Sequence, residues 1–276
     1  MSSTFKIGTI ESVSPEARLL IEINHQCISY IVIDNGNECV AISSRQFAKD
    51  MGGIDKAGNV LKQLVSDDNI LQEDFKNTTI IYSHPQSVMV PSDLLQDDQK
   101  KDMLELVHGD MSDSFIRTDF LFRQYTHNIY PVPKQIDAIA TYLFSSPVST
   151  HLYSLLPDMF QGTGNHLHCI FSASSFTAML VKESKLQAIQ SFSFKTPEDV
   201  AYHMLQLCEA FGADVNDITL HLNGMIDKTS NLYTELYKYF VQVEFATLSP
   251  AFTYPEGIHD FPQHYFSHLF AAALCV

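Results

Sequence analysis

The sequence predicts an α/β protein made of two related halves, each with the element order β-β-β-α-β-α-β. The first observation is an internal repeat: LLIEINHQCISYIVIDNGNECVAI, from Leu19, aligns without a gap with LHCIFSASSFTAMLVKESKLQAIQ, from Leu167, 148 residues later. Apolar positions and polar breaks coincide, and each copy is typical of three strands joined by two short turns. The second observation is size, because 276 residues of which 45% are hydrophobic can bury two cores of ordinary dimensions.

The second half shows its remaining elements most clearly. In KTPEDVAYHMLQLCEAFG, Thr196 is a typical N-cap, Pro197 suits the first helical position and Gly212 is a typical stop. The apolar face of this helix is formed by Val200, Met204, Leu207 and Phe211. The patterns that follow predict a strand at Asp217–Leu222, a helix at Thr229–Phe240 and a strand at Val241–Ala246.

The first half follows the same order less clearly. We expect a short helix containing Leu61–Val65, a strand at Thr78–Ser83, a helix from Ser92 to about Val107 and a last strand at Asp119–Gln124. A connecting helix is expected to begin near Pro133, and the boundary between the halves near Pro147. The expected domains are residues 1–146, residues 147–260 and a C-terminal helix, 261–276, that packs back on the first domain.

A duplicated unit of this order resembles the actin-like ATPase superfamily, in which each half is a ribonuclease-H-like domain, and the resemblance covers nearly the whole chain. Within that superfamily, the phrases FKTPEDVAYHMLQLCEAFG and FPQHYFSHLF are similar to an uncharacterised bacterial family, chiefly from Bacteroidota, that is known only as a domain of unknown function. The layout is also similar to actin-related proteins that assemble bacterial division and pilus machinery. The resemblance therefore implies either an ATPase or a scaffold.

The turn at Asp34-Asn35-Gly36 could be taken for a phosphate loop, but its place in the repeat argues against that. It joins the second and third strands, and the second copy fills the same turn with KESK. Asn-Gly tolerates positive φ, so we predict a type I′ hairpin turn at this position.

The resemblance places the phosphate loops between the first and second strands of each copy. Phosphate binding favours glycine, whose backbone allows a close approach, and carboxylates that position Mg²⁺. The actin-like pattern expects Asp where this sequence has Glu22 and Ile170. It expects glycine where this sequence has Asn24 in the first copy and Ser172 and Ala173 in the second. The Gly-Gly that contacts adenosine in the family is similar to Gly224-Met225. The candidate cleft residues, all at degenerate positions, are Glu22, Asn24, Ser172, Ser174, Ser175 and Gly224.

Other patterns predict no catalytic or metal centre. His264 and His268 have the spacing of zinc ligands on one helix face, but among aromatic residues this spacing is more often a packed face. His166 and His168 could form a ligand pair on one side of a strand, although a solvent-facing strand start is the better interpretation. QGTGN, at 161–165, precedes a strand instead of opening a helix and indicates a turn. We therefore expect no catalytic residue, no metal and no cofactor.

Charge and composition exclude several classes of partner. There are 17 basic and 32 acidic residues, a formal charge of −15, which on average repels nucleic acids and anionic membranes. A ribonuclease-H-like nuclease would need a carboxylate cluster, and beyond Glu22 no convincing set can be assigned. Residues 1–10 lack the apolar core of a secretory signal, and the longest apolar run, Leu269–Val276, is too short to span a membrane. The five cysteines contain no CxxC and suggest reduced thiols, so we expect a cytoplasmic protein.

The sequence is compatible with two functions. The favoured one is a protein-interaction or scaffold role without catalysis, in which a cleft between two related domains has lost its nucleotide chemistry and the partner is an unidentified protein. The alternative is a small-molecule or nucleotide-binding sensor, or an atypical ATPase, that uses the six candidate residues of the cleft.

Overall fold

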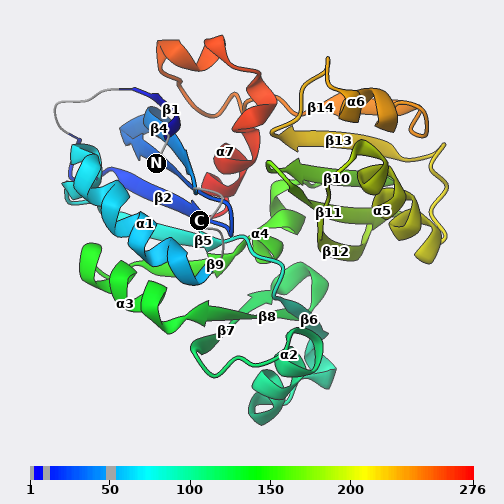
Figure 1. The fold of residues 1–276 in the computed structure, drawn as a ribbon, viewed down its shortest axis with the longest axis horizontal. Helices are drawn as coiled ribbons and strands as arrows, with labels where there is room; N and C mark the ends of the chain where they lie inside the picture. Colours follow the sequence, from blue (N-terminus) through cyan, green and yellow to red (C-terminus); the bar gives the residue numbers. More distant parts are fainter. Residues whose placement is uncertain (1–2, 9–12, 48–53) are drawn as a thin grey trace. The chain divides into compact units, whose positions relative to one another are not determined.

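The structure is a computed structural model that describes residues 3–8, 13–47 and 54–276. The chain forms two compact units (Figure 1). The first unit comprises Met1–Leu155 and Ala251–Ile258, and the second comprises Leu156–Pro250 and His259–Val276. The unit boundary follows Leu155, later than the expected Pro147, because β9 (Val148–His151) still pairs with β5 (Asn77–Tyr82) in the first sheet.

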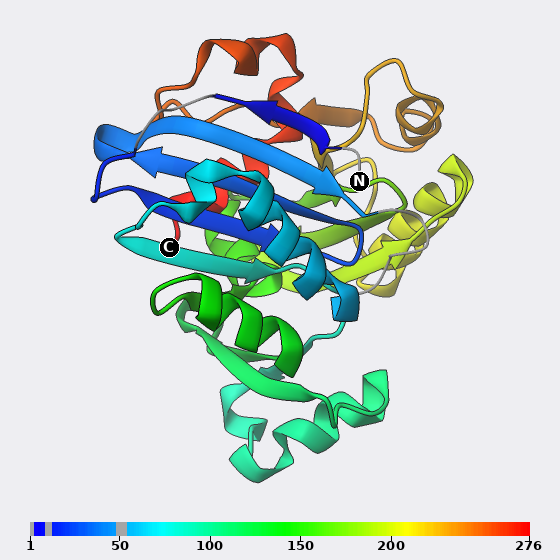
Figure 2. The same cartoon turned by 60° about the vertical axis from the view of Figure 1, so that its left-hand side comes forward.

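The first unit is built on a six-stranded sheet with the order β1-β4-β3-β2-β5-β9. Its remaining strands are β1 (Ser3–Ile7), β2 (Arg18–Ile23), β3 (Cys27–Asp34) and β4 (Glu38–Gln46). The β2, β3 and β4 strands form an antiparallel meander, and β5 and β9 extend it in parallel. Helices α1 (Ile54–Asp67) and α3 (Lys134–Leu143) pack together, and Figure 2 shows α1 crossing one face of this sheet.

The first unit also contains an insertion between β5 and α3 that the sequence did not reveal. It holds β6 (Val88–Pro91), α2 (Lys100–His108), β7 (Ser114–Leu121) and β8 (Thr126–Pro133), with the strands in the order β6-β8-β7. Its own small core includes Val90, Leu104, Met111 and Ile129. The expected last strand at Asp119–Gln124 was wrong, because β7 belongs to this separate sheet and the true last strand is β9.

Two further expectations for the first half need correction. The helix expected to begin at Ser92 is instead two 3₁₀ turns followed by α2, because the Ser92 hydroxyl donates to the carbonyl of Tyr125 and does not cap a helix. The short helix around Leu61–Val65 is the 14-residue α1. The connecting helix near Pro133 is confirmed as α3, with Pro133 at its N-cap.

The second unit contains a five-stranded sheet with the order β12-β11-β10-β13-β14. Its strands are β10 (His166–Phe171), β11 (Ser175–Lys182), β12 (Lys185–Ser193), β13 (Thr219–Gly224) and β14 (Gln242–Phe245). Two helices follow as expected, α5 (Pro197–Ala210) and α6 (Asn231–Leu236). Thr196 caps α5 in a capping box with Asp199, which confirms the predicted start of this helix.

The predicted duplication is confirmed strand for strand. The bounds of β2 and β3 are reproduced 148 residues later by β10 and β11, and both sheets have the same order of their five shared strands. Even the irregularity in the next pairing is shared: a bulge lies between Val32 and Ile33 in one unit and between Leu180 and Val181 in the other. Each unit is thus a ribonuclease-H-like domain, and the chain has the actin-like duplicated fold.

The turn after β3 is a hairpin turn, as predicted, but its type differs from the expected one. In the first unit, Asn35–Asn37 form a three-residue 3₁₀ turn in which Gly36 and Asn37 have positive φ, and Asp34 accepts from the backbone N–H of Asn35. In the second unit, Glu183 and Ser184 both have positive φ, as a two-residue type I′ turn requires.

The C-terminal segment is grouped with the second unit. The last helix of this segment is α7 (Ser267–Ala273), which contacts β13. The second unit begins within α4 (Leu152–Met159), at Leu156. The expectation that residues 261–276 pack back on the first domain stays a prediction. Within the described ranges, no helix combines the length and apolar character needed to cross a membrane. The assessment of residues 1–10 as a signal falls partly outside the described residues.

Candidate functional site

The loop between β2 and β3 is closed by the side chain of Asn24. Its carboxamide oxygen accepts hydrogen bonds from the backbone N–H groups of Gln26 and Cys27, both at 2.7 Å, and its Nδ2 donates to the Cys27 sulfur at 3.2 Å. Asn24 is buried, with 6% of its surface exposed. These two amides are therefore already paired, whereas a phosphate-binding loop directs such amides at its ligand.

Glu22 lies on the sheet face opposite the helices. Its strand neighbours Ile21 and Ile23 belong to the core beneath α1, so alternation turns Glu22 to the other face, where it is buried. Beside it in the sheet, the Ser29 hydroxyl donates to the Ser44 hydroxyl at 2.9 Å. Burial, with a further contribution from Glu22, raises the pKa of Cys27 to about 11, so this thiol stays protonated near neutral pH.

The second unit repeats this layout with different side chains. Ile170 occupies the place of Glu22 and is buried. The neighbouring hydroxyls of Thr177 and Ser191 lie 2.7 Å apart, like the pair in the first unit. In the loop itself, Ser172 is half-buried, Ser174 is exposed and Ser175 is buried.

The backbone of the two loops is the same. Asn24 N–H donates to the Cys27 carbonyl at 3.1 Å, and Ser172 N–H donates to the Ser175 carbonyl at 2.8 Å. The loop of the second unit also lies beside the end of β13, because Phe171 pairs with Gly224. The structure thus brings the three serines near Gly224 in one unit, and Glu22 near Asn24 in the other. A joint cleft that uses both groups stays a prediction.

Gly224 is required by the backbone. Its φ is +77°, and a Cβ at this position would lie 2.2 Å from the carbonyl oxygen of Phe171. Glycine avoids both the unfavourable φ and the clash. The glycine that the sequence suggested as part of a nucleotide site therefore also has a purely structural reason to be there.

The loop after Gly224 is held by the C-terminal segment of the same unit. Ser267 Oγ donates to the side-chain oxygen of Asn223 at 2.9 Å, a His264 ring nitrogen lies 2.6 Å from the carbonyl of Ile226, and Tyr265 donates to Asp227 at 2.6 Å. His264, considered above as a zinc ligand, is thus used in a contact with the backbone.

Three histidines of the second unit form a cluster that the sequence only half revealed. His166 and His168 project from β10, and His221 projects from the adjacent parallel strand β13, directly opposite His168. One potential ligand atom of each lies within 4.8 Å of the others. The sequence paired His166 with His168, but only the β10–β13 register adds His221. We refer to His166, His168 and His221 as the histidine cluster.

Burial and neighbouring rings define the environment of the histidine cluster. His168 is 9% exposed and stacks between Phe160 and His221, with ring centroids 4.7 and 4.3 Å away. Burial, reinforced by His221 and His166, lowers the pKa of His168 to about 2. Burial and His166 also lower the pKa of His221, against a smaller opposing effect of Glu244. Neutral imidazoles of this kind carry a lone pair that can bind a metal ion.

Comparison with known families decides the classification of the chain. A family model described as "Protein of unknown function (DUF3822)" matches residues 9–243. The chain belongs to the DUF3822 family. No curated protein matches this member of DUF3822.

Solved structures agree with the fold of this DUF3822 chain. It is similar to a protein of Bacteroides thetaiotaomicron with an actin-like ATPase fold and unknown function: identity is 17%, the match covers 89% of this chain and 96% of that one, and the TM-score is 0.75. It is also similar to a chain of the PilM–PilN type IV pilus biogenesis complex, with 11% identity, coverage of 93% and 98%, and a TM-score of 0.59. At these identities the similarity establishes the fold alone.

Proposed function

We propose that this chain is a non-hydrolysing actin-like protein that acts as a scaffold for a protein partner. The observation that carries the proposal is the pairing of the β2–β3 loop amides with Asn24, so that they are not offered to a phosphate. On the other strand that should carry a carboxylate, Ile170 provides a hydrocarbon side chain, which cannot hold a magnesium-bound water. Catalysis of ATP hydrolysis would need loop amides that are free to bind the phosphate and a carboxylate at the position of Ile170.

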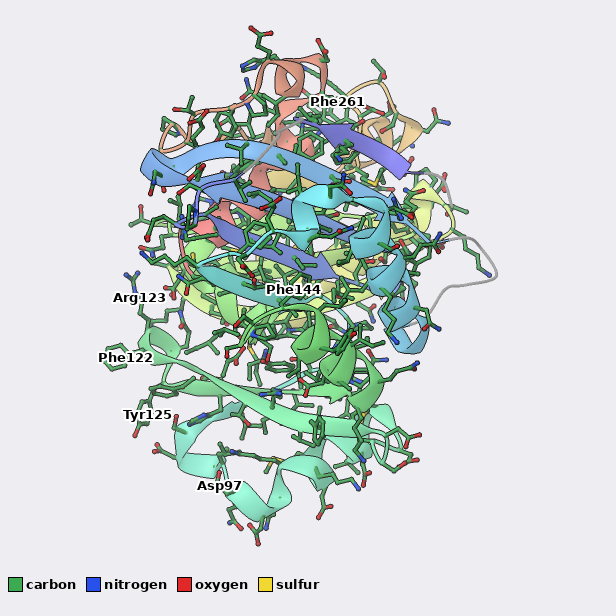
Figure 3. All side chains as sticks on the ribbon, turned by 90° about the vertical axis from the view of Figure 1, so that its left-hand side faces the viewer. Asp97, Phe122, Arg123, Tyr125, Phe144 and Phe261 are labelled. Carbon is green, nitrogen blue, oxygen red and sulfur yellow. The ribbon has the colours of Figure 1, made fainter. Side chains whose placement is uncertain are left out.

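An exposed aromatic surface on the insertion supports the scaffold role. Phe122 is 83% exposed and Tyr125 59% exposed, and both lie in the connection between β7 and β8 with Phe120 beside them, at ring centroid distances of 6.2 and 6.1 Å. Figure 3 shows Phe122, Arg123 and Tyr125 projecting outward from the ribbon. Clustered exposed aromatic side chains with an arginine are typical of binding surfaces between proteins.

The fold and the charge of the chain are in line with this proposal. PilM, a protein of the same fold, was solved in complex with its partner PilN. The formal charge of −15 disfavours a nucleic-acid partner, so we propose a protein partner. We also propose a cytoplasmic location, which the free cysteines favour.

Calorimetry tests the absence of nucleotide chemistry. The folded full-length chain is titrated with ATP, ADP and GTP in the presence of Mg²⁺, and phosphate release is followed in parallel. We expect no heat of binding and no turnover above background. Micromolar binding would instead favour a nucleotide-binding sensor that uses Glu22, and turnover that is lost in Glu22→Ala would overturn the proposal.

Cross-linking tests the aromatic surface. Wild-type chain and the double variant Phe122→Ser/Tyr125→Ser are cross-linked in native lysate, and partners are quantified by mass spectrometry. Tyr142→Ser is the matched control, because Tyr142 is an 85% exposed aromatic residue of α3 in the same unit. We expect one set of partners to fall at least tenfold in the double variant and to persist in the control. Equal recovery from all three proteins would contradict a role for this surface.

A further inference from the structure

The histidine cluster has the ligand geometry of a metal site. His166 Nδ1 and His221 Nε2 are 3.0 Å apart, and a nitrogen of His168 completes a set within 4.8 Å. Two nitrogens bound to one tetrahedral zinc ion at about 2.05 Å are separated by roughly 3.3 Å. Small rotations of the three rings would therefore bring all of them to bonding distance.

Neighbouring oxygen atoms indicate which ring nitrogens carry hydrogens. The Thr163 carbonyl, which can only accept, lies 2.9 Å from His166 Nε2, so this nitrogen carries the hydrogen and Nδ1 keeps its lone pair. The Glu244 carboxylate lies 3.5 Å from His221 Nδ1 and favours a hydrogen there, which leaves the lone pair on Nε2. Two lone pairs then face each other across 3.0 Å.

A cation between these rings resolves the conflict. A carbonyl or carboxylate on the outer nitrogen is also the usual arrangement around metal-bound histidines, because it orients the ring and raises its basicity. His168 is compatible with this role, because its Nδ1 is buried and has no hydrogen-bond partner among the described residues. The same holds for the Nδ1 atoms of His84 and His203, so the site rests on the grouping of the three imidazoles and not on this atom.

We propose that the histidine cluster binds one Zn²⁺ ion through His166, His168 and His221. Three imidazoles match the ligand preference of zinc and leave a fourth position for water or an anion. The ion would join the starts of β10 and β13, which lie side by side in Figure 1, and would fix the 161–165 turn through the bond between Thr163 and His166. This site lies within one unit and does not rest on the scaffold proposal.

Elemental analysis of the full chain, purified without a histidine tag, tests the site. The protein is stripped with a chelator, incubated with Zn²⁺ and desalted before the metal is measured. We expect one zinc per chain, less than one tenth of that in His166→Ala and His221→Ala, and the full amount in His203→Ala. His203 is the matched control, because it lies on α5 and stacks on Phe192 away from the cluster. Replacement of Zn²⁺ by Co²⁺ should give the visible absorption of a tetrahedral site.

A second variant keeps the test decisive if a histidine variant does not fold. Glu244 is 65% exposed, so Glu244→Gln should leave the fold intact while weakening zinc binding about tenfold, as loss of an outer-shell partner does. Wild-type protein without bound zinc, or zinc content unchanged in both His166→Ala and His221→Ala, would overturn the proposal. In that case His166 and His221 share a proton instead of a metal ion.

Discussion

The two units of this chain have the same backbone and different polar chemistry. The bounds of β2 and β3 recur in β10 and β11, and the bulge after Val32 recurs after Leu180. The side chains at matching places differ: Asn24 closes its loop in the first unit, whereas the second has Ser172 there. The second unit also has the histidine cluster, of which His168 and His166 lie four and six residues before Ser172.

The difference between the two units shows which features the fold requires and which positions can vary. The backbone hydrogen bonds that close both loops involve no particular side chain, so they survive changes of residue type. Positions on the face opposite the helices, such as Glu22 and Ile170, are not needed for the core beneath α1 or α5. A carboxylate at such a position can be replaced by a hydrocarbon side chain without loss of the fold. The residues at these positions therefore indicate function, whereas the architecture does not.

The largest expected effect concerns the end of the fourth shared strand, where the first unit has the buried Tyr82 and the second has Gly224. Gly224→Ala should destabilise the chain by about 3 kcal/mol, because it adds a positive-φ penalty to a backbone clash with the Phe171 carbonyl. Gly36→Ala is the control, since Gly36 also has positive φ but has open space, and it should cost about 1 kcal/mol. Urea unfolding measures both, and equal costs would contradict the steric explanation.

The next largest effect is the pH dependence of stability that comes from two buried histidines of the first unit, which are not part of the histidine cluster. His151 and His84 are buried, and a ring nitrogen of each lies 3.0 Å from a backbone carbonyl, that of His84 and that of Pro131 respectively. Burial lowers the pKa of His84 to about 4 and that of His151 well below its usual value. The folded state therefore binds fewer protons than the unfolded state below pH 6.5, and stability falls as the pH falls from there towards 4.

Each of these histidines should remove about 2 kcal/mol of stability between pH 7 and pH 5. His151→Gln keeps a donor for the His84 carbonyl but does not titrate, so the difference between the free energies of unfolding at pH 7 and pH 5 should shrink by that amount. His259→Gln, at an exposed position, should leave the difference unchanged. An unchanged difference in His151→Gln would show that this residue titrates normally in the folded state.

Sequence alone predicted the shared parts of the two units and missed what was added to one of them. Strand periodicity and the gapless repeat were sufficient for β2, β3, β10 and β11, and capping residues were sufficient for α5. The insertion was missed because the strand predicted at Asp119–Gln124, which overlaps β7, was assigned to the main sheet, and because β6 and β8 were not predicted as strands. Whether a strand joins one sheet or another depends on pairing between distant residues, which local periodicity does not encode.

The histidine cluster and the role of Asn24 were also only partly predictable from the sequence. Alternation placed His166 and His168 on one side of a strand, but the third member, His221, depends on the register between β10 and β13. The role of Asn24 was missed for another reason. Asn24 was interpreted only as a replacement for glycine. Its side-chain oxygen in fact accepts hydrogen bonds from the backbone N–H groups two and three residues later, and so takes the place of a phosphate oxygen.

The smallest expected effect is the loss of stability when the Asn24 side chain is removed, compared with the same change at Ser172 in the second unit. Asn24→Ala removes two short hydrogen bonds to half-buried amides and should cost about 1.5 kcal/mol. Ser172→Ala, at the matching place in the second unit, should cost less than about 0.5 kcal/mol, because the loop there is closed by the backbone bond from Ser172 to Ser175. Urea unfolding gives both values, and Asn24→Asp should recover more than half of the loss because a carboxylate oxygen can accept from both amides. If Asn24→Ala and Ser172→Ala cost the same, the two loops are closed by their backbones alone, and the amides of Gln26 and Cys27 are available to a ligand.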